Sequence, residues 1–162
     1  MNLSIQSSHL ILTHLPQILH WARTELRNEI SGELTLPQLR MMGLVQQGIS
    51  SASELSEWSG ITLPATTRMV AHLVSKNLIQ KKTLNTDRRK TLLSLTPIGH
   101  KKLNQIQKKL ELRLATHMKK LAPSAVRKLS FGLEELASLT QLLTGYAVKN
   151  ETKEIEVTQL FE

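Results

Sequence analysis

A capped helix with proline in its first turn constrains the fold of this chain more than any other feature. Thr62 is a suitable N-cap, and Leu63 and Pro64 follow it in the turn where proline's missing N–H costs nothing. We expect the helix to reach about Lys76 and to stop at Asn77, because asparagine tolerates the left-handed conformation. The pattern therefore predicts a short helix with defined ends.

The two sides of this predicted helix differ in character. Apolar residues are expected to face inward, and small, polar or basic residues are expected to face outward. The inward set is Met69, Val70 and Leu73, and the outward set is Ala65, Thr66, Arg68 and His72.

A hairpin is predicted directly after this helix. Residues 78–83 and 90–95 are two runs of β-favouring residues. The tip between them, residues 84–89, combines turn formers with the basic pair Arg88 and Arg89. A polar helix followed by a basic hairpin is typical of a winged helix-turn-helix.

Further helices are predicted on both sides. Apolar periodicity indicates a long first helix over His9–Ile30, a fifth helix reaching Leu121, and a sixth helix ending near Lys149. Cap and proline signals begin the intervening helices at Thr35, at Ser51 or Ser53, and at Thr96. The expected fold class is mainly α with a small β-hairpin wing, a winged helix-turn-helix with long N- and C-terminal helices.

Positive charge is concentrated in the same region. The formal net charge of the chain is +8, and residues 35–102 contribute +7 of it. No acidic residue occurs from Ile61 to Thr86. This distribution indicates an acidic partner, either nucleic acid or an anionic membrane surface.

Several classes of function find no support in the sequence. The chain has no cysteine, which excludes disulfides, thiolate metal sites and cysteine redox switches. The histidines lack i, i+4 spacing, and there is no Gly-rich phosphate loop or nucleophile elbow, so we expect neither a metal, a cofactor nor an enzyme. Without a signal peptide or an apolar run of about 18 residues, a cytoplasmic protein is expected.

Four stretches of the chain resemble the MarR family of multiple antibiotic resistance regulators. They are residues 52–56, 66–73, 76–79, and Asp-Arg-Arg-Lys at 87–90 leading to Leu-Thr-Pro-Ile-Gly at 95–99. The last stretch looks like the wing signature of the family. The chain departs from the family at Asn77, where glycine is usual, and at Trp58, which is bulkier than the usual aliphatic residue.

The resemblance implies a regulator that binds double-stranded DNA through the helix and the wing. Small side chains at the start of the helix would let it enter a major groove, although a solvated surface helix is the alternative interpretation. Asp87 would fix Arg89 in the minor groove, while Arg88 and Lys90 would meet phosphates. The expected DNA-binding residues are Leu63, Pro64, Ala65, Thr66, Thr67, Arg68, His72, Lys82, Asp87, Arg88, Arg89 and Lys90.

The resemblance also implies a small ligand, often a phenolic anion, that releases DNA from a cleft beside the dimerisation helices. Ordinary packing between helices explains the same residues equally well. The residues expected to line the cleft are His14, Trp21, Met41, Met42 and Arg113.

A homodimer is expected because the long flanking helices exceed what one small core can cover. A two-fold dimer would hold two recognition helices about 34 Å apart on a pseudo-palindromic operator. The expected segments are an N-terminal dimerisation helix at 1–34, a DNA-binding lobe at 35–100, C-terminal dimerisation helices at 101–149 and a flexible acidic tail at 150–162.

The sequence thus predicts a homodimeric, sequence-specific transcriptional repressor that a ligand releases. The alternative is a winged-helix module that contacts an acidic protein or binds DNA without sequence preference.

Overall fold

Helices and a two-stranded hairpin form the described part of the chain, residues 2–30, 32–84 and 87–144 of a computed structural model. The chain divides into two units, Met1–His117 and Met118–Glu162. Within the described residues, none of the helices has the length and apolar character that crossing a bilayer requires.

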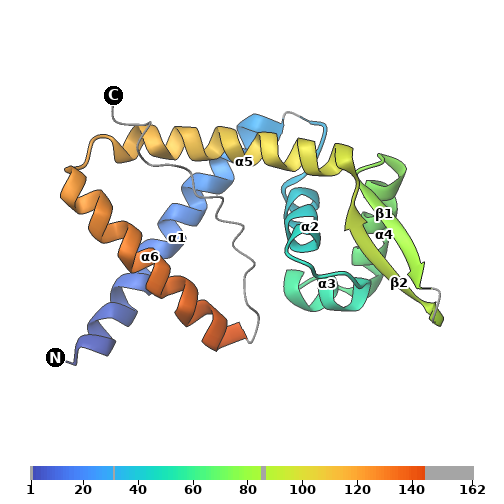
Figure 1. The fold of residues 1–162 in the computed structure, drawn as a ribbon, viewed down its shortest axis with the longest axis horizontal. Coiled ribbons are helices and arrows are strands. Elements are labelled where there is room, and N and C mark those ends of the chain that lie inside the picture. The colour runs from blue at the N-terminus through green and yellow to red at the C-terminus, as the bar shows by residue number, and fades with distance from the viewer. Residues whose placement is uncertain (1, 31, 85–86, 145–162) are drawn as a thin grey trace. The chain divides into compact units, whose positions relative to one another are not determined.

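The elements follow the predicted order, which confirms the expected fold class (Figure 1). The first unit contains α1 (Leu3–Ile30), α2 (Leu36–Gln46), α3 (Ala52–Ser59), α4 (Leu63–Ser75), β1 (Ile79–Leu84), β2 (Asp87–Leu95) and α5 (Pro97–Met118). The second unit contains α6 (Pro123–Thr144).

Two helix boundaries differ from the predictions. Helix α1 begins at Leu3 instead of His9 because the Asn2 side chain accepts a hydrogen bond from the Ser4 N–H at 3.0 Å and caps the first turn. Helix α5 ends at Met118 and does not reach Leu121. A local cap thus accompanies the start of α1, and the end of α5 is followed by a turn in which the Leu121 N–H donates to the Met118 carbonyl at 3.0 Å.

The core of the first unit lies where α2, α3, α4 and the hairpin meet the start of α5. Helix α2 buries Leu39, Met42 and Val45, as its spacing predicts, and also Met41 and Leu44. Burying a side chain of this size contributes about 1.5–3 kcal/mol. The other elements contribute the buried residues Leu55, Val70, Leu73, Ile79, Leu93, Leu95 and Leu103.

Side-chain caps begin α2 and α3. Thr35 and Gln38 form a capping box at α2, and Ser51 and Glu54 form a second one at α3. Of the two serines predicted as possible N-caps, Ser51 is therefore the one that caps α3. These boxes satisfy N–H groups that a helix start would otherwise leave unpaired.

The hairpin is confirmed and is longer than predicted. Its strands pair in antiparallel register from Ile79 opposite Leu95 to Thr83 opposite Thr91. The Leu93 N–H donates to the Ser50 carbonyl at 2.7 Å, which joins β2 to the connection between α2 and α3. The hairpin is thus part of the lobe and is fixed at its base.

A close backbone approach joins the end of α4, the hairpin and α5. Asn77 adopts φ 55°, which confirms the predicted left-handed stop. The Thr96 hydroxyl donates to the Asn77 carbonyl at 2.6 Å and accepts from the Gly99 N–H at 2.9 Å, so Thr96 is the predicted cap of α5. A Cβ on Gly99 would lie 2.0 Å from the Leu78 carbonyl oxygen, so only glycine fits there.

We predict that Gly99→Ala lowers the free energy of unfolding by about 2 kcal/mol or more, because backbone atoms must move to admit a methyl group. Gly43→Ala is the matched control, since its added Cβ meets nothing within 4 Å in α2. The control should raise stability by about 0.5–1 kcal/mol through helix propensity. Urea unfolding measures both, and equal effects of the two substitutions would contradict the close approach.

Candidate nucleic-acid interface

One face of α4 is anchored in the core, and this fixes which side chains the helix exposes. Thr66, Val70 and Leu73 are buried with exposures of 0–2%. These positions follow i, i+4 and i+7 spacing and so share one face. The core consequently does not cover the start of α4 or its outward side.

The outward side of α4 presents most of the residues predicted to bind DNA. Pro64, Arg68 and His72 are exposed at i, i+4 spacing, and Leu63 and Thr67 form a neighbouring exposed pair. Ala65, another of the seven residues predicted on this helix, is half-buried. The structure thus brings an apolar helix start, a hydroxyl and a guanidinium onto one surface.

Thr66 does not belong to this surface. Its side chain is fully buried and its hydroxyl has no hydrogen-bond partner among the described residues. The prediction that Thr66 faces outward is wrong, because its spacing from Val70 and Leu73 outweighs its polarity. Its hydroxyl could reach a base only if the helix left the core.

The start of α4 favours an anion. Thr62 has the extended backbone of an N-cap, as predicted, but its side chain makes no capping hydrogen bond. The first turn contains no acidic residue. A helix start with unpaired N–H groups and a positive dipole end suits a phosphate.

Basic side chains continue from α4 onto the hairpin. Lys81 and Lys82 on β1 are exposed. The backbone of β2 includes Asp87, Arg88, Arg89 and Lys90. The side chains of these four residues are outside the described part of the structure.

The described register shifts between Thr83 and Leu84, where the β2 partner changes from Thr91 to Asp87. Residues 88–90 therefore have no Cα partner in that register.

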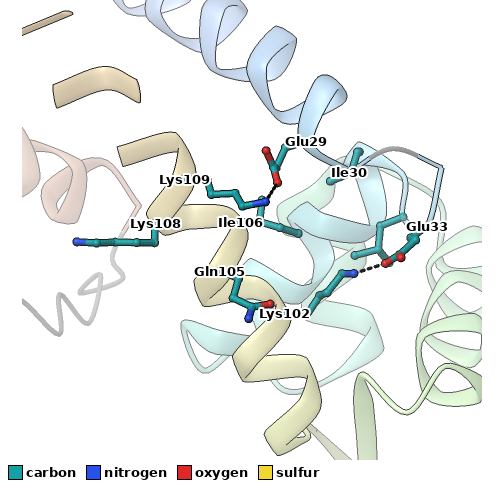
Figure 2. A pocket seen from close by; sticks show the side chains of 9 residues that line it. Glu29, Ile30, Glu33, Lys102, Gln105, Ile106, Lys108 and Lys109 are labelled. Carbon is teal, nitrogen blue, oxygen red and sulfur yellow. Dashed lines mark hydrogen bonds and ion pairs between the residues drawn. The ribbon is translucent and has the colours of Figure 1, made fainter. Parts of the chain in front are cut away.

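Ion pairs join α5 to α1 and to the turn that follows α1. Lys102 pairs with Glu33, and Lys109 pairs with Glu29 (Figure 2). The hydrogen bond and charge of Lys102 lower the pKa of the Glu33 carboxyl below its usual range. Lys76, the C-cap residue of α4, donates to the backbone carbonyl of Glu33. Glu33 therefore contacts both the end of α4 and the start of α5.

The residues predicted to bind a ligand fall into separate environments. Met41 and Met42 are fully buried in the core, and His14 is exposed on α1. Arg113 is held by Glu25 and by Glu29, the latter at 3.4 Å.

Trp21 lines a pocket of about 340 Å³ between α1 and α5. Its ring meets that of His117 edge-on, with centroids 5.9 Å apart. We name this cavity the Trp21 pocket. The sequence analysis missed the other four lining residues, Gln17, Ile18, Leu114 and His117. The spacing of Gln17 and Ile18 from Trp21, about one helical turn, could have indicated the two that lie on α1.

Comparisons with known proteins agree with this geometry. The sequence model of the MarR family matches residues 34–91, which confirms the family resemblance. The comparison with curated proteins gives no match.

Solved structures share the fold at low sequence identity. A MarR family protein from Bacillus stearothermophilus has a TM-score of 0.71 at 16% identity, over 87% of this chain and 99% of that one. Wild-type apo MarR from E. coli has a TM-score of 0.63 at 22% identity, over 75% and 92%. S. aureus MepR bound to ethidium bromide has a TM-score of 0.57 at 18% identity, over 78% and 94%.

We predict that Thr66→Val raises the free energy of unfolding by about 1 kcal/mol, because it removes a buried hydroxyl without a partner. It should leave affinity for duplex DNA within twofold of the original. Thr67→Val, the same change one residue along, removes an exposed hydroxyl that donates to Leu63 at 2.9 Å and should weaken DNA binding. Urea unfolding and fluorescence anisotropy measure the two effects. Loss of DNA affinity in Thr66→Val alone would reverse the assignment.

Proposed function

We propose that this chain, whose residues 34–91 match the MarR family and whose fold is that of MarR structures, is a sequence-specific regulator that binds double-stranded DNA. The observation that carries the proposal is the exposed face of α4. That face combines Pro64, Arg68 and His72 while the opposite face is held in the core. Helix α4 enters the major groove, and the hairpin contacts the neighbouring backbone and minor groove.

Selection and affinity come from different groups in this proposal. Leu63, Pro64 and Ala65 contact base edges, and Arg68 reads guanine or holds a phosphate. Lys82 on β1 and Lys90 on β2 contribute salt-dependent phosphate contacts. Thr67 and His72 complete the helix contacts, and Arg89, fixed by Asp87, enters a narrow A·T-rich minor groove while Arg88 meets a phosphate.

A homodimer completes the proposal. Helix α1 exposes large apolar side chains along much of its length, and α6 does the same. Apolar faces of this extent are covered in stable proteins, and a second copy supplies a matching face through two-fold symmetry. The exposed apolar residues include Leu3, Ile5, Leu12 and Leu19 on α1, and Leu129, Phe131, Leu133, Leu142 and Leu143 on α6.

Repression released by a small molecule is the finer part of the proposal. The Trp21 pocket is large enough for a small aromatic ligand. MepR, a structural neighbour, binds the aromatic compound ethidium. A ligand between α1 and α5 would change the spacing of the two DNA-binding lobes in the dimer and so release the operator.

DNA binding is tested with the intergenic DNA upstream of the gene, against a scrambled duplex of equal length. Arg68→Ala should weaken binding at least fivefold, and Arg89→Ala should weaken it with loss of A·T preference. Lys82→Ala should reduce the salt dependence by about one charge without changing preference. Arg23→Ala on α1 is the matched control and should bind like the original chain. Equal binding to both duplexes would instead favour the module without sequence preference.

Dimerisation is tested by light scattering over a range of concentrations. The original chain should have twice the mass of one copy. Leu12→Glu and Leu133→Glu should each raise the dimer dissociation constant at least tenfold, because a carboxylate would be buried without a partner. Asn28→Glu, an exposed position on α1, is the control. If all three variants associate equally, these faces do not form the dimer.

A further inference from the structure

Helix α4 begins differently from the helices around it. Capping boxes begin α2 and α3, and the Thr96 hydroxyl caps the first turn of α5. Thr62 has the backbone of an N-cap at α4, but its side chain makes no capping hydrogen bond. Since no side chain of its own fixes the first turn of α4, the position of that turn depends on the residues that precede it.

The connection before α4 is short. Helix α3 ends at Ser59 and α4 starts at Leu63, so three residues join them. We name residues 60–62 the α3–α4 turn. Gly60 adopts the left-handed conformation with φ 70°, and its N–H donates to carbonyls of α3. A connection of this length passes any change at the end of α3 directly to the start of α4.

The Ser56 side chain joins the α3–α4 turn to α3. Its hydroxyl donates to the Ile61 carbonyl at 2.7 Å. The Ile61 side chain is partly buried and packs against the core. Both the carbonyl and the side chain of Ile61 are therefore held, and Ile61 is the residue directly before the N-cap of α4.

A second contact reaches the end of α3 from α2. The Arg40 guanidinium donates to the Trp58 carbonyl at 3.0 Å. A cation beside the last carbonyls of a helix is also favoured by the helix dipole. The Trp58 side chain packs against the core, as that of Ile61 does. Arg40 therefore holds the end of α3 in place relative to α2.

We propose that Arg40 and Ser56 are positioning residues that determine which DNA sequence the chain selects, although neither reads a base. They fix the α3–α4 turn, and this turn fixes Leu63 and Pro64, which contact base edges in the proposed function. This inference rests on that function, because selection is defined only for a chain that binds DNA.

The two parts of DNA binding depend differently on the placement of α4. Contacts with base edges weaken steeply with distance and angle, so a small shift of the helix start removes them. Attraction between basic side chains and phosphates acts over a longer range and tolerates such a shift. Loss of either positioning residue should therefore lower the preference for one sequence more than the affinity for DNA in general.

Selection is tested by fluorescence anisotropy with the upstream intergenic DNA and with a scrambled duplex of equal length. Ser56→Ala should lower the ratio of the two affinities at least fivefold while affinity for the scrambled duplex stays within twofold. Ser59→Ala is the matched control, because the Ser59 hydroxyl donates to carbonyls within α3 and should leave the ratio within twofold. Equal losses in the two serine variants would overturn the role of Ser56.

The salt dependence of binding separates positioning from a phosphate contact at Arg40. Arg40→Met should lower the affinity ratio at least fivefold without changing the salt slope, whereas loss of a phosphate contact lowers the slope by about one. Arg40→Lys should retain the ratio, because its ammonium can donate to the same carbonyl. Arg27→Met, which removes an exposed charge from α1, is the control and should change neither quantity. A slope lowered by about one in Arg40→Met would overturn the positioning role.

The α3–α4 turn is tested without DNA by amide hydrogen exchange in NMR spectra. The Thr66 N–H donates to the Thr62 carbonyl at 2.9 Å and should exchange at least fivefold faster in Ser56→Ala and in Arg40→Met. The Leu55 N–H, which has the equivalent place in α3, is the internal control and should exchange as in the original chain. Unchanged exchange at Thr66, or equal acceleration at Leu55, would show that these side chains do not hold the turn.

The two sets of measurements fail separately. If the original chain binds the upstream and scrambled duplexes equally, the proposed function fails, while hydrogen exchange still decides whether Arg40 and Ser56 hold the start of α4. If the original chain prefers the upstream DNA and both variants keep that preference, the proposed function stands and the positioning role is refuted.

Discussion

The close packing of Gly99 against the Leu78 carbonyl is the contact on which the arrangement of the first unit depends. At this point the backbone leaves α4, enters β1, and later returns through β2 into α5. Thr96 pairs with the groups that this junction would otherwise leave unsatisfied. A larger residue at position 99 would separate the hairpin from α5, and the exposed face of α4 would then lose its fixed position relative to the hairpin.

The interface and the core are two sides of the same helix. Burial of Val70 and Leu73 turns Arg68 and His72 outward, because the angle between successive side chains around a helix is fixed. The outward side carries no acidic group. An anion would therefore meet basic side chains, the positive end of the helix dipole and the N–H groups of the first turn together. An electrostatic surface of this kind gives affinity for any duplex, and only its shape and base contacts give selection.

Polar contacts add to the apolar packing through which Ile30 of α1 and Leu103 and Ile106 of α5 join the core of this lobe. Glu33 joins α4 to α5 through Lys76 and Lys102, and Glu29 joins α1 to α5 through Lys109. Exposed ion pairs of this kind are individually weak and sensitive to salt. They are suited to rearrangement, unlike the packed junction at Gly99. The first unit therefore connects its lobe to α1 and α5 through both apolar packing and ion pairs.

The sequence by itself determined the order of helices and hairpin, the caps at Thr35 and Thr96, the stop at Asn77, and the concentration of positive charge, because these depend on near neighbours along the chain. It missed the cap at Asn2 and the inward direction of Thr66. Only the tertiary structure decided that Thr66 is buried, that Gly99 touches Leu78, and that Glu29 of α1 and Glu33 of the turn after it meet lysines of α5, because such contacts join residues far apart in sequence. Periodicity predicts a face, but what covers that face depends on packing.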